Sequence, residues 1–255
     1  MTRDDSFFAR HAGWFGVAFF LALWEAAARF GWRDPSIMPA PSQAILAAIV
    51  HLPPGELVEH VAWSLWRVFA GFGIGAGAAI ALGIAAGWYR PVALVARPFV
   101  EILRPIPPLA WIPIAIVWFG LGEPSKIFVI VIGVFFPVFT ATARGMASIP
   151  PVILRAARTM DVDGVRLLIK VAIPAAMPDI ATGLRIGFGL GFGVLVAAEL
   201  IAAERGMGHL VMEARQLGQL GVSIFGIFLI GIVNLIADRQ LARLIGRTIG
   251  RWHAL

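Results

Sequence analysis

Long apolar segments alternate with short polar ones along most of the chain. About 20 consecutive apolar residues are needed to cross a bilayer as a helix. Five segments meet that requirement and predict membrane-spanning helices: residues 13–30, 63–88, 126–146, 180–203 and 222–244. The first also ends like a cleavable signal peptide, at Ala26-Ala27-Ala28, but its length and Glu25 favour a retained span.

A sixth apolar segment, residues 97–121, is interrupted by prolines. It contains Pro105, Pro107, Pro108 and Pro113, which cannot all lie in one regular helix. Broken helices at membrane depth are tolerated where they line a cavity or are buried in protein. We therefore expect a break here, with a kinked packing helix as the alternative. The pattern as a whole predicts an all-α, polytopic transmembrane bundle of about six spans.

Glycines recur along two of the predicted spans at helical spacing. They are Gly71, Gly75, Gly83 and Gly87 in the second span, and Gly183, Gly187 and Gly191 in the fifth. Such a row of small residues lets another helix approach closely. Pro137 lies within the fourth span, where we expect it to break the helix.

The segment 150–178 lies between two spans but is too charged to face lipid. Its pattern predicts two short helices, separated by a turn at residues 161–164. Asp163 is suited to cap the second helix, and Pro174 and Pro178 are expected to end it before the next span. One face of the first helix holds Ile153, Ala156, Ala157 and Met160. A small apolar helix of this kind can fill a groove in another protein; an ordinary cytoplasmic linker is the alternative.

The pattern divides the chain into four parts. Residues 1–11 form a short N-terminus, 12–60 the first span with an external amphipathic segment, 61–248 the transmembrane core with its loop 148–178, and 249–255 a tail. Within the amphipathic segment, Ser42 is a candidate helix cap. We expect one face of that helix to lie on the membrane: Ala44, Ile45, Ala48 and Ile49.

Composition and charge exclude several classes of function. Only 14% of residues are charged, against about 25% in soluble domains, and mean hydropathy is +0.85. The net charge of +6 comes from dispersed basic residues, which suit membrane topology and lipid headgroups rather than nucleic acid. With both ends inside, thirteen basic residues fall on inner segments and five on outer ones, which makes the loop 148–178 cytoplasmic.

The sequence holds no site for ATP hydrolysis or other catalysis. Neither Lys126 nor Lys170 follows a glycine, so no phosphate-binding loop is present. The chain has no cysteine, and its five histidines lack metal-ligand spacing. If the protein pumps, another chain must therefore supply the energy.

Three charged residues within or near the spans are candidates for a pathway. Glu101 and Arg104 are three residues apart and can pair on one helix face. Glu199, towards the outer end of the fifth span, is a functional candidate, although pairing with a neighbouring helix is equally open. An anionic solute would be favoured if Arg67, Arg104 or Arg185 faced inward.

Several of these segments resemble the permease subunits of binding-protein-dependent ABC importers. Residues 104–113 (Arg-Pro-Ile-Pro-Pro-Leu-Ala-Trp-Ile-Pro) are similar to the nitrate, sulfonate, taurine and bicarbonate branch, as is Ile-Met-Pro-Ala-Pro-Ser at 37–42. The charged loop resembles that family's coupling loop, with Ala156 and Ala157 matching and Val171-Ala172-Ile173-Pro174 ending it. Arg155 replaces the family's Glu, and Asp161 replaces a Gly that permits a left-handed turn. Asp is among the few residues that tolerate that turn.

The resemblance implies a MetI-like type I importer fold in a bacterial plasma (inner) membrane, with both termini cytoplasmic. It implies two ABC ATPase subunits as partners, which would hold ATP and Mg²⁺, so this chain itself would bind no cofactor. A periplasmic or lipid-anchored solute-binding protein, a second permease copy and membrane lipids complete the expected assembly; a related permease in place of the second copy is the alternative. The solute would be small and anionic.

The resemblance also assigns roles to residues. The expected ATPase-coupling set is Arg155, Ala156, Ala157, Arg158, Thr159, Met160, Asp161 and Asp163. The expected pathway or gate set is Glu101, Arg104, Pro105, Pro107, Pro108, Trp111 and Glu199. A self-contained secondary transporter or channel is the alternative, and it would show inverted repeats and a coupling-ion site of its own. A polytopic membrane enzyme would need a clustered acid/base or metal set.

Overall fold

The computed structural model describes residues 5–31 and 37–249, which form helices and no strand. The long helices are α1 (Asp5–Arg29), α3 (Pro54–Trp88), α6 (Glu123–Ala147), α9 (Ile173–Ala202) and α11 (Leu220–Ile249). The short ones are α2 (Pro41–His51), α4 (Arg90–Leu103), η1 (Pro108–Trp111), α5 (Ile112–Phe119), α7 (Pro151–Arg158), α8 (Gly164–Leu167), η2 (Leu168–Ala172) and α10 (Met207–Gln216). The predicted cytoplasmic ends include residues 1–4 and 250–255, which lie outside the described residues.

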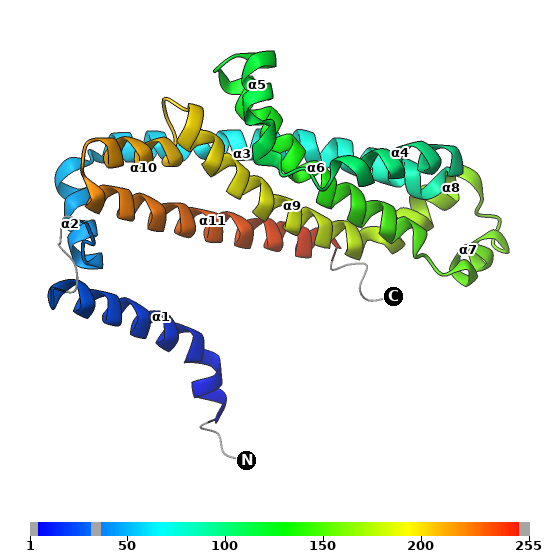
Figure 1. Ribbon diagram of the computed structural model, residues 1–255. Coiled ribbons are helices and arrows are strands. Elements are labelled where there is room, and N and C mark those ends of the chain that lie inside the picture. Colours follow the sequence, from blue (N-terminus) through cyan, green and yellow to red (C-terminus); the bar gives the residue numbers. More distant parts are fainter. Residues whose placement is uncertain (1–4, 32–36, 250–255) are drawn as a thin grey trace.

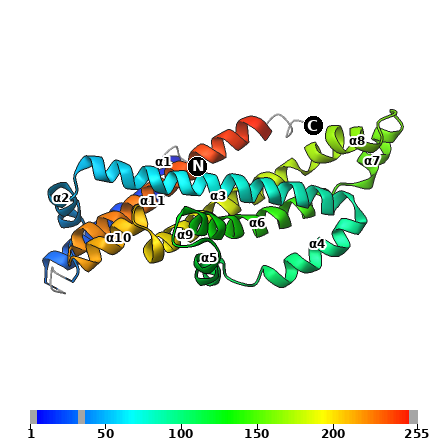
Figure 2. The same cartoon turned by 90° about the horizontal axis from the view of Figure 1, so that it is seen from above.

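Within the described residues, four helices are long and apolar enough to cross a membrane: Pro54–Trp88, Glu123–Ala147, Gly164–Ala202 and Leu220–Arg247. The pair formed by α4 and η1–α5 is a fifth candidate, bent by 89° at the predicted proline break. Figure 2 shows α4 turning back from the end of α3 toward the middle of the bundle, where α5 follows. The remaining predicted span, residues 13–30, corresponds to α1, a helix of 25 residues that is not among these candidates, so this span stays a prediction.

The centre of the molecule is α6, which packs between α3 and α9 (Figure 1). Both predicted glycine rows face it. A Cβ at Gly75 would lie 2.9 Å from the carbonyl oxygen of Val131, and a Cβ at Gly187 would lie 2.7 Å from Val138 Cγ2. These helices can approach so closely only because the glycines carry no side chain, as the spacing predicted.

The helix break predicted at Pro137 and the helix end predicted at Pro174 and Pro178 are wrong. Pro137 lies inside an unbroken α6, and Gly164–Ala202 forms one 39-residue helical unit that passes through Pro174 and Pro178. Residues Leu168–Ala172, which end two positions before Pro174, form a π-helical turn. A proline removes one N–H from the helix ladder, and a local change of hydrogen-bond register lets the helix continue past it.

The amphipathic segment also differs from prediction. The helix α2 begins at Pro41, so Ser42 lies within its first turn rather than at the cap. The carboxylate of Glu25 in α1 accepts hydrogen bonds from the Ser42 N–H (3.1 Å) and hydroxyl (2.6 Å), and so satisfies the start of α2 from outside. Ile45 and Ile49 are exposed as expected, whereas Ala44 and Ala48 are buried, on a helix that packs against α11.

The bundle has two distinct ends. Figure 1 shows α7 and α8 at one end, and α2 and α10 at the other. The charged loop is therefore separated by the length of the spans from the loops that precede α3 and α10.

Candidate coupling segment and cavity

The helix α7 presents apolar side chains at the end of the bundle. It contains no buried residue, and Met160 just beyond it is 77% exposed, while Ile153 is 41% exposed. Leu154 anchors the segment, since it packs against a core cluster that includes Met146, Ile149 and Ala172. One side of α7 is thus fixed to the spans and the other is free to contact another protein.

The turn after α7 has the geometry of a Schellman cap. Asp161 has φ of +58°, the left-handed conformation that the sequence predicted for this position. The N–H of Asp161 donates to the carbonyl of Arg158, and the N–H of Val162 donates to that of Ala157, both at 3.1 Å. This pair of bonds satisfies carbonyls that the helix end leaves free, in a motif where glycine usually occupies the left-handed position.

The remaining predicted coupling residues lie beside this turn. The Thr159 hydroxyl donates to the carbonyl of Ala156 at 2.7 Å, and so closes the last turn of the helix. Asp163 occupies the N-cap position of α8 as predicted, but its side chain makes no capping hydrogen bond. Arg155, Arg158 and Asp163 are exposed. All eight predicted coupling residues therefore belong to one continuous, accessible segment.

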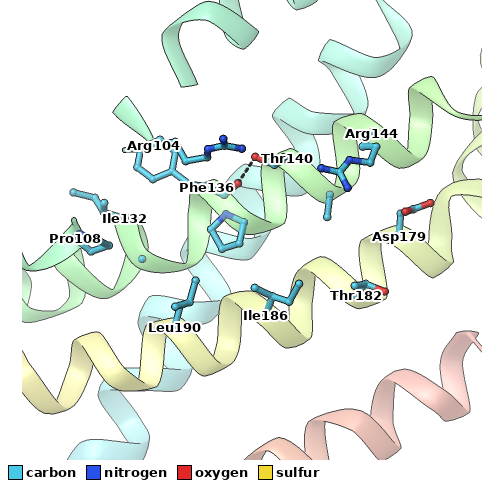
Figure 3. Close-up of a pocket in the computed structure, with 13 residues that line it drawn as sticks. Arg104, Pro108, Ile132, Phe136, Thr140, Arg144, Asp179, Thr182, Ile186 and Leu190 are labelled. Carbon is cyan, nitrogen blue, oxygen red and sulfur yellow. Dashed lines mark hydrogen bonds between the residues drawn. The ribbon is translucent and has the colours of Figure 1, made fainter. Parts of the chain in front are cut away.

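A cavity of about 420 Å³ lies between α6 and α9 near the proline break (Figure 3). Its wall is mostly apolar, from residues such as Ile132, Phe136 and Leu190. Arg104 from the end of α4 and Arg144 from α6 lie along one edge with Thr140 between them, while Asp179 lies on α9 (Figure 3). The cavity thus combines an apolar wall with two cations and one carboxylate.

A second cavity, of about 290 Å³, adjoins the first and shares Arg104, Thr140 and Arg144 with it. Its other charged residues are Arg97 and Glu101. Three arginines and two carboxylates line the two cavities together, an excess of one positive charge. This arrangement favours an anion over a cation.

The structure brings together only some of the predicted pathway residues. Glu101, Arg104 and Pro108 line one or both cavities, and Pro105 and Pro107 lie in the break that positions Arg104. Trp111 ends η1 and lines neither cavity, and its indole nitrogen is buried without a hydrogen-bond partner. The predicted Glu101–Arg104 pair is wrong: among the described residues, neither side chain forms an ion pair.

Glu199 also lies away from both cavities. Its carboxylate is buried and accepts a hydrogen bond from Arg67 Nη1 at 2.8 Å, so the structure shows the pairing alternative. Arg185 does not line the cavities either, and its guanidinium lies 3.5 Å from Asp238 of α11. Of the three proposed inward arginines, Arg104 alone lines these two cavities. Arg67 instead lines a separate cavity of about 400 Å³, together with Glu123, Lys126 and Arg205.

Sequence reasoning missed four polar residues of the larger cavity. Thr140 and Arg144 are four residues apart on α6, and Asp179 and Thr182 are three apart on α9. Each pair therefore shares a helix face. The signal that could have identified these residues is the presence of two polar pairs at helical spacing within apolar spans.

Residues 73–250 match a family model described as the binding-protein-dependent transport system inner membrane component. The chain belongs to this family. A protein named as an ABC transporter permease in Methanocaldococcus jannaschii is 40% identical over 227 residues, which cover 87% of this chain and 84% of that protein. The taurine transport system permease protein TauC of Escherichia coli is 36% identical over 242 residues, or 93% of this chain and 88% of TauC.

A solved structure of the inward-facing MetNI methionine ABC transporter supports the same fold. It matches with a TM-score of 0.51 and 22% identity, over 72% of this chain and 91% of the MetNI chain. The chain is therefore the membrane-spanning permease subunit of an ABC importer with a MetI-like fold. Membership of this family implies ATPase and solute-binding partners.

Proposed function

We propose that this permease couples to two separate ATPase subunits through α7 and the turn after it, and carries a small anion past the cavity between α6 and α9. ATP and Mg²⁺ would be held by those subunits and not by this chain. The observation that carries the coupling proposal is the exposed apolar face of α7. Leu154 fixes this helix to the spans, because it packs against the core cluster that includes Met146 and Ile149.

The connections of α7 suggest how coupling works. The segment joins the end of α6 to the 39-residue helical unit that contains α9. A movement of α7, driven by closure of the ATPase pair, would therefore reach both helices that form the cavity. Alternating access of the cavity to the two sides of the membrane follows from a tilt of these two helices.

The chemistry of the cavity supports an anion of the sulfonate or taurine type, with nitrate and bicarbonate as further members of the class. Arg104 and Arg144 can donate charge-assisted hydrogen bonds, and Thr140 lies between them. The relative TauC is named for taurine transport, which agrees with an anionic headgroup.

The proposed assembly is a homodimer of permeases in a bacterial plasma (inner) membrane, with both termini in the cytoplasm and with an external solute-binding protein. The excess of basic residues at the α7 end supports this orientation. The family description, which names a binding-protein-dependent system, supports the external partner.

The test is an Ala157→Arg substitution in the tagged full chain, recovered from its own cells in mild detergent. Ala157 is half-buried beside the Schellman turn, where a large charged side chain does not fit. We expect normal membrane insertion, but loss of the ATPase subunits that co-purify with the unmodified chain, as measured by mass spectrometry.

Gln216→Arg is the matched control, because it adds the same charge at an exposed helix position at the opposite end of the bundle. It should retain the ATPase. Normal ATPase retention by Ala157→Arg would show that α7 is not the docking element, and the absence of any ATPase from the unmodified chain would overturn the coupling proposal.

A further inference from the structure

Three helices meet around one buried arginine at the end of the bundle opposite α7. Arg67 of α3 is 2% exposed. Its guanidinium donates to Glu123 at the start of α6 (2.5 and 2.8 Å) and to Glu199 near the end of α9 (2.8 Å). Lys126 adds a second cation, 3.0 Å from Glu123. These four side chains are electrically balanced, with two cations and two carboxylates, as expected of a buried ionic cluster.

The same side chains hold the backbone of the loop before α10. Arg67 donates to the carbonyl of Arg205, and Gly206 N–H donates to His60 Nδ1 at 3.0 Å. The next two amides belong to the first turn of α10. Met207 N–H donates at 2.8 Å to the hydroxyl of Ser64, which itself donates to Glu199 at 2.7 Å, and Gly208 N–H donates to Glu199 at 2.9 Å. Four successive residues, the last two of the loop and the first two of α10, are thus tied to side chains of α3 and α9.

The loop fits the cluster so tightly that position 206 requires glycine. Gly206 has φ of +127°, which other residues rarely adopt. A Cβ there would lie 2.4 Å from Glu199 Oε1 and 2.7 Å from Arg67 Nη1. The backbone at Gly206 therefore packs against the Arg67–Glu199 ion pair with no space for a side chain.

The cluster lies at one edge of the membrane-spanning region, which is the outer edge in the proposed orientation. About 20 residues of α3 separate Arg67 from Trp88 at the other end of the helix, which corresponds to about 30 Å. This length equals the thickness of the hydrocarbon core of a bilayer. Beyond it, α3 continues to Pro54 with residues such as Glu56, Glu59 and His60. A buried ionic cluster at this depth links the lipid-embedded part of three helices to the surface outside the membrane.

We propose that Arg67 and Glu199 are positioning residues, which fix the loop 203–206 and α10 to α3, α6 and α9 so that the outer surface moves with these spans as one body. A partner that binds outside would then meet a surface whose position reports the state of the spans. The proposal does not depend on docking at α7, because the cluster lies at the opposite end of the molecule.

Spin labelling tests this directly, since the chain has no native cysteine. Glu204→Cys places one label on an exposed loop residue that makes no hydrogen bond to the cluster among the described residues. In the full chain in lipid nanodiscs, we expect an immobilised nitroxide spectrum. Adding Glu199→Gln, which keeps the shape but removes the charge, should shift the spectrum to fast motion on the nanosecond timescale.

Further variants separate a local effect from loss of the fold. Gly206→Ala should mobilise the same label by steric conflict, with every charge retained, and Ser64→Ala is a milder change that removes one loop contact. Glu56→Gln, an exposed acid at the start of α3, should leave the spectrum unchanged. A label at Asp163→Cys, at the opposite end, should show the same spectrum in every background.

An immobile loop label in both Glu199→Gln and Gly206→Ala would overturn the proposal. So would equal mobilisation of the labels at positions 204 and 163 in all three variants (Glu199→Gln, Gly206→Ala and Ser64→Ala), because that result would mean general unfolding. Mobilisation confined to position 204 in Gly206→Ala or Ser64→Ala supports the proposal even if Glu199→Gln fails to fold.

Discussion

Arg104 and Arg144 differ from Arg67 in being uncompensated. Arg67 is buried between two carboxylates, whereas neither Arg104 nor Arg144 forms an ion pair in the part of the chain that the structure describes. A guanidinium facing a cavity without a partner is available to an anionic solute. At the residue scale, this difference separates a structural arginine from a candidate ligand-binding one.

We predict that Arg144→Gln lowers uptake of the transported anion by roughly tenfold or more, since a hydrogen bond to a charged group is worth about 1.5–3 kcal/mol. Retention of the ATPase should be unchanged. Arg185→Gln is the control, because Arg185 is exposed and pairs with Asp238 outside both cavities. Uptake in cells that express the complete transporter provides the measurement. Equal uptake by the two variants would contradict a role for Arg144.

The left-handed residue of the coupling turn makes a second prediction. Asp161→Val should open the turn after α7, because a β-branched residue at positive φ costs about 1–3 kcal/mol. Asp161→Gly should tighten the turn. Limited trypsin cleavage after Arg158 measures the opening. Asp163→Val is the matched control: its φ of −132° is extended and accepts valine, so its cleavage rate should not rise. Similar rates for the two valine variants would refute the argument.

Local residue features were predictable and distant contacts were not. The left-handed conformation of Asp161 followed from its place in a short pattern whose usual residue is glycine. The partner of Glu199 is Arg67, 132 positions earlier, and no local spacing connects the two. Glu101 and Arg104 have good spacing for a pair, but α4 ends at Leu103 and Arg104 lies at the break, where its side chain turns to the cavities.

At the scale of elements, the two glycine rows on either side of α6 determine how the core packs. Gly71, Gly75, Gly83 and Gly87 of α3 all approach α6, whereas Gly73 and Gly77 on the other face of α3 have nothing within 4 Å of a Cβ. The same residue type therefore has opposite roles on two faces of one helix. Only the first row is required by packing.

This contrast predicts opposite effects of one substitution. Gly75→Leu should lower the thermal stability of the purified permease, because overpacking costs about 1–3 kcal/mol even before backbone atoms collide. Gly77→Leu should keep or raise it, since glycine is about 1 kcal/mol less favourable than alanine within a helix. The loss of the monodisperse gel-filtration peak on heating measures both. Equal losses would mean that the α3–α6 contact is misplaced.

Periodicity predicted the helices well and their ends less well. The spacing of apolar residues and glycines is repeated over many positions, so it identifies a span and its packed face. A proline acts at one position, and its effect depends on the hydrogen bonds around it. A π-turn precedes Pro174 and α6 continues unbroken through Pro137, whereas three prolines within four residues at 105–108 coincide with the 89° bend.

At the scale of the whole molecule, the two ends carry different chemistry. The α7 end is rich in basic residues, with an exposed apolar helix, while the opposite end is held by the buried Arg67 cluster and carries acids such as Glu56, Glu59 and Glu213 at its surface. Basic residues near the ends of spans favour the cytoplasmic side. The distribution of charge thus supports the proposed orientation, and a cytoplasmic α7 is a condition for ATPase docking.

Thiol labelling of single-cysteine variants tests this orientation, since no background cysteine interferes. Asp163→Cys reports the α7 end and Gln216→Cys the α10 end, and both positions are exposed. With a membrane-impermeant maleimide, we expect Gln216→Cys to react in intact spheroplasts. Asp163→Cys should react only in inverted vesicles or after permeabilisation. The reversed pattern would place α7 outside, where no cytoplasmic ATPase reaches it, and would exclude both the orientation and the proposed coupling.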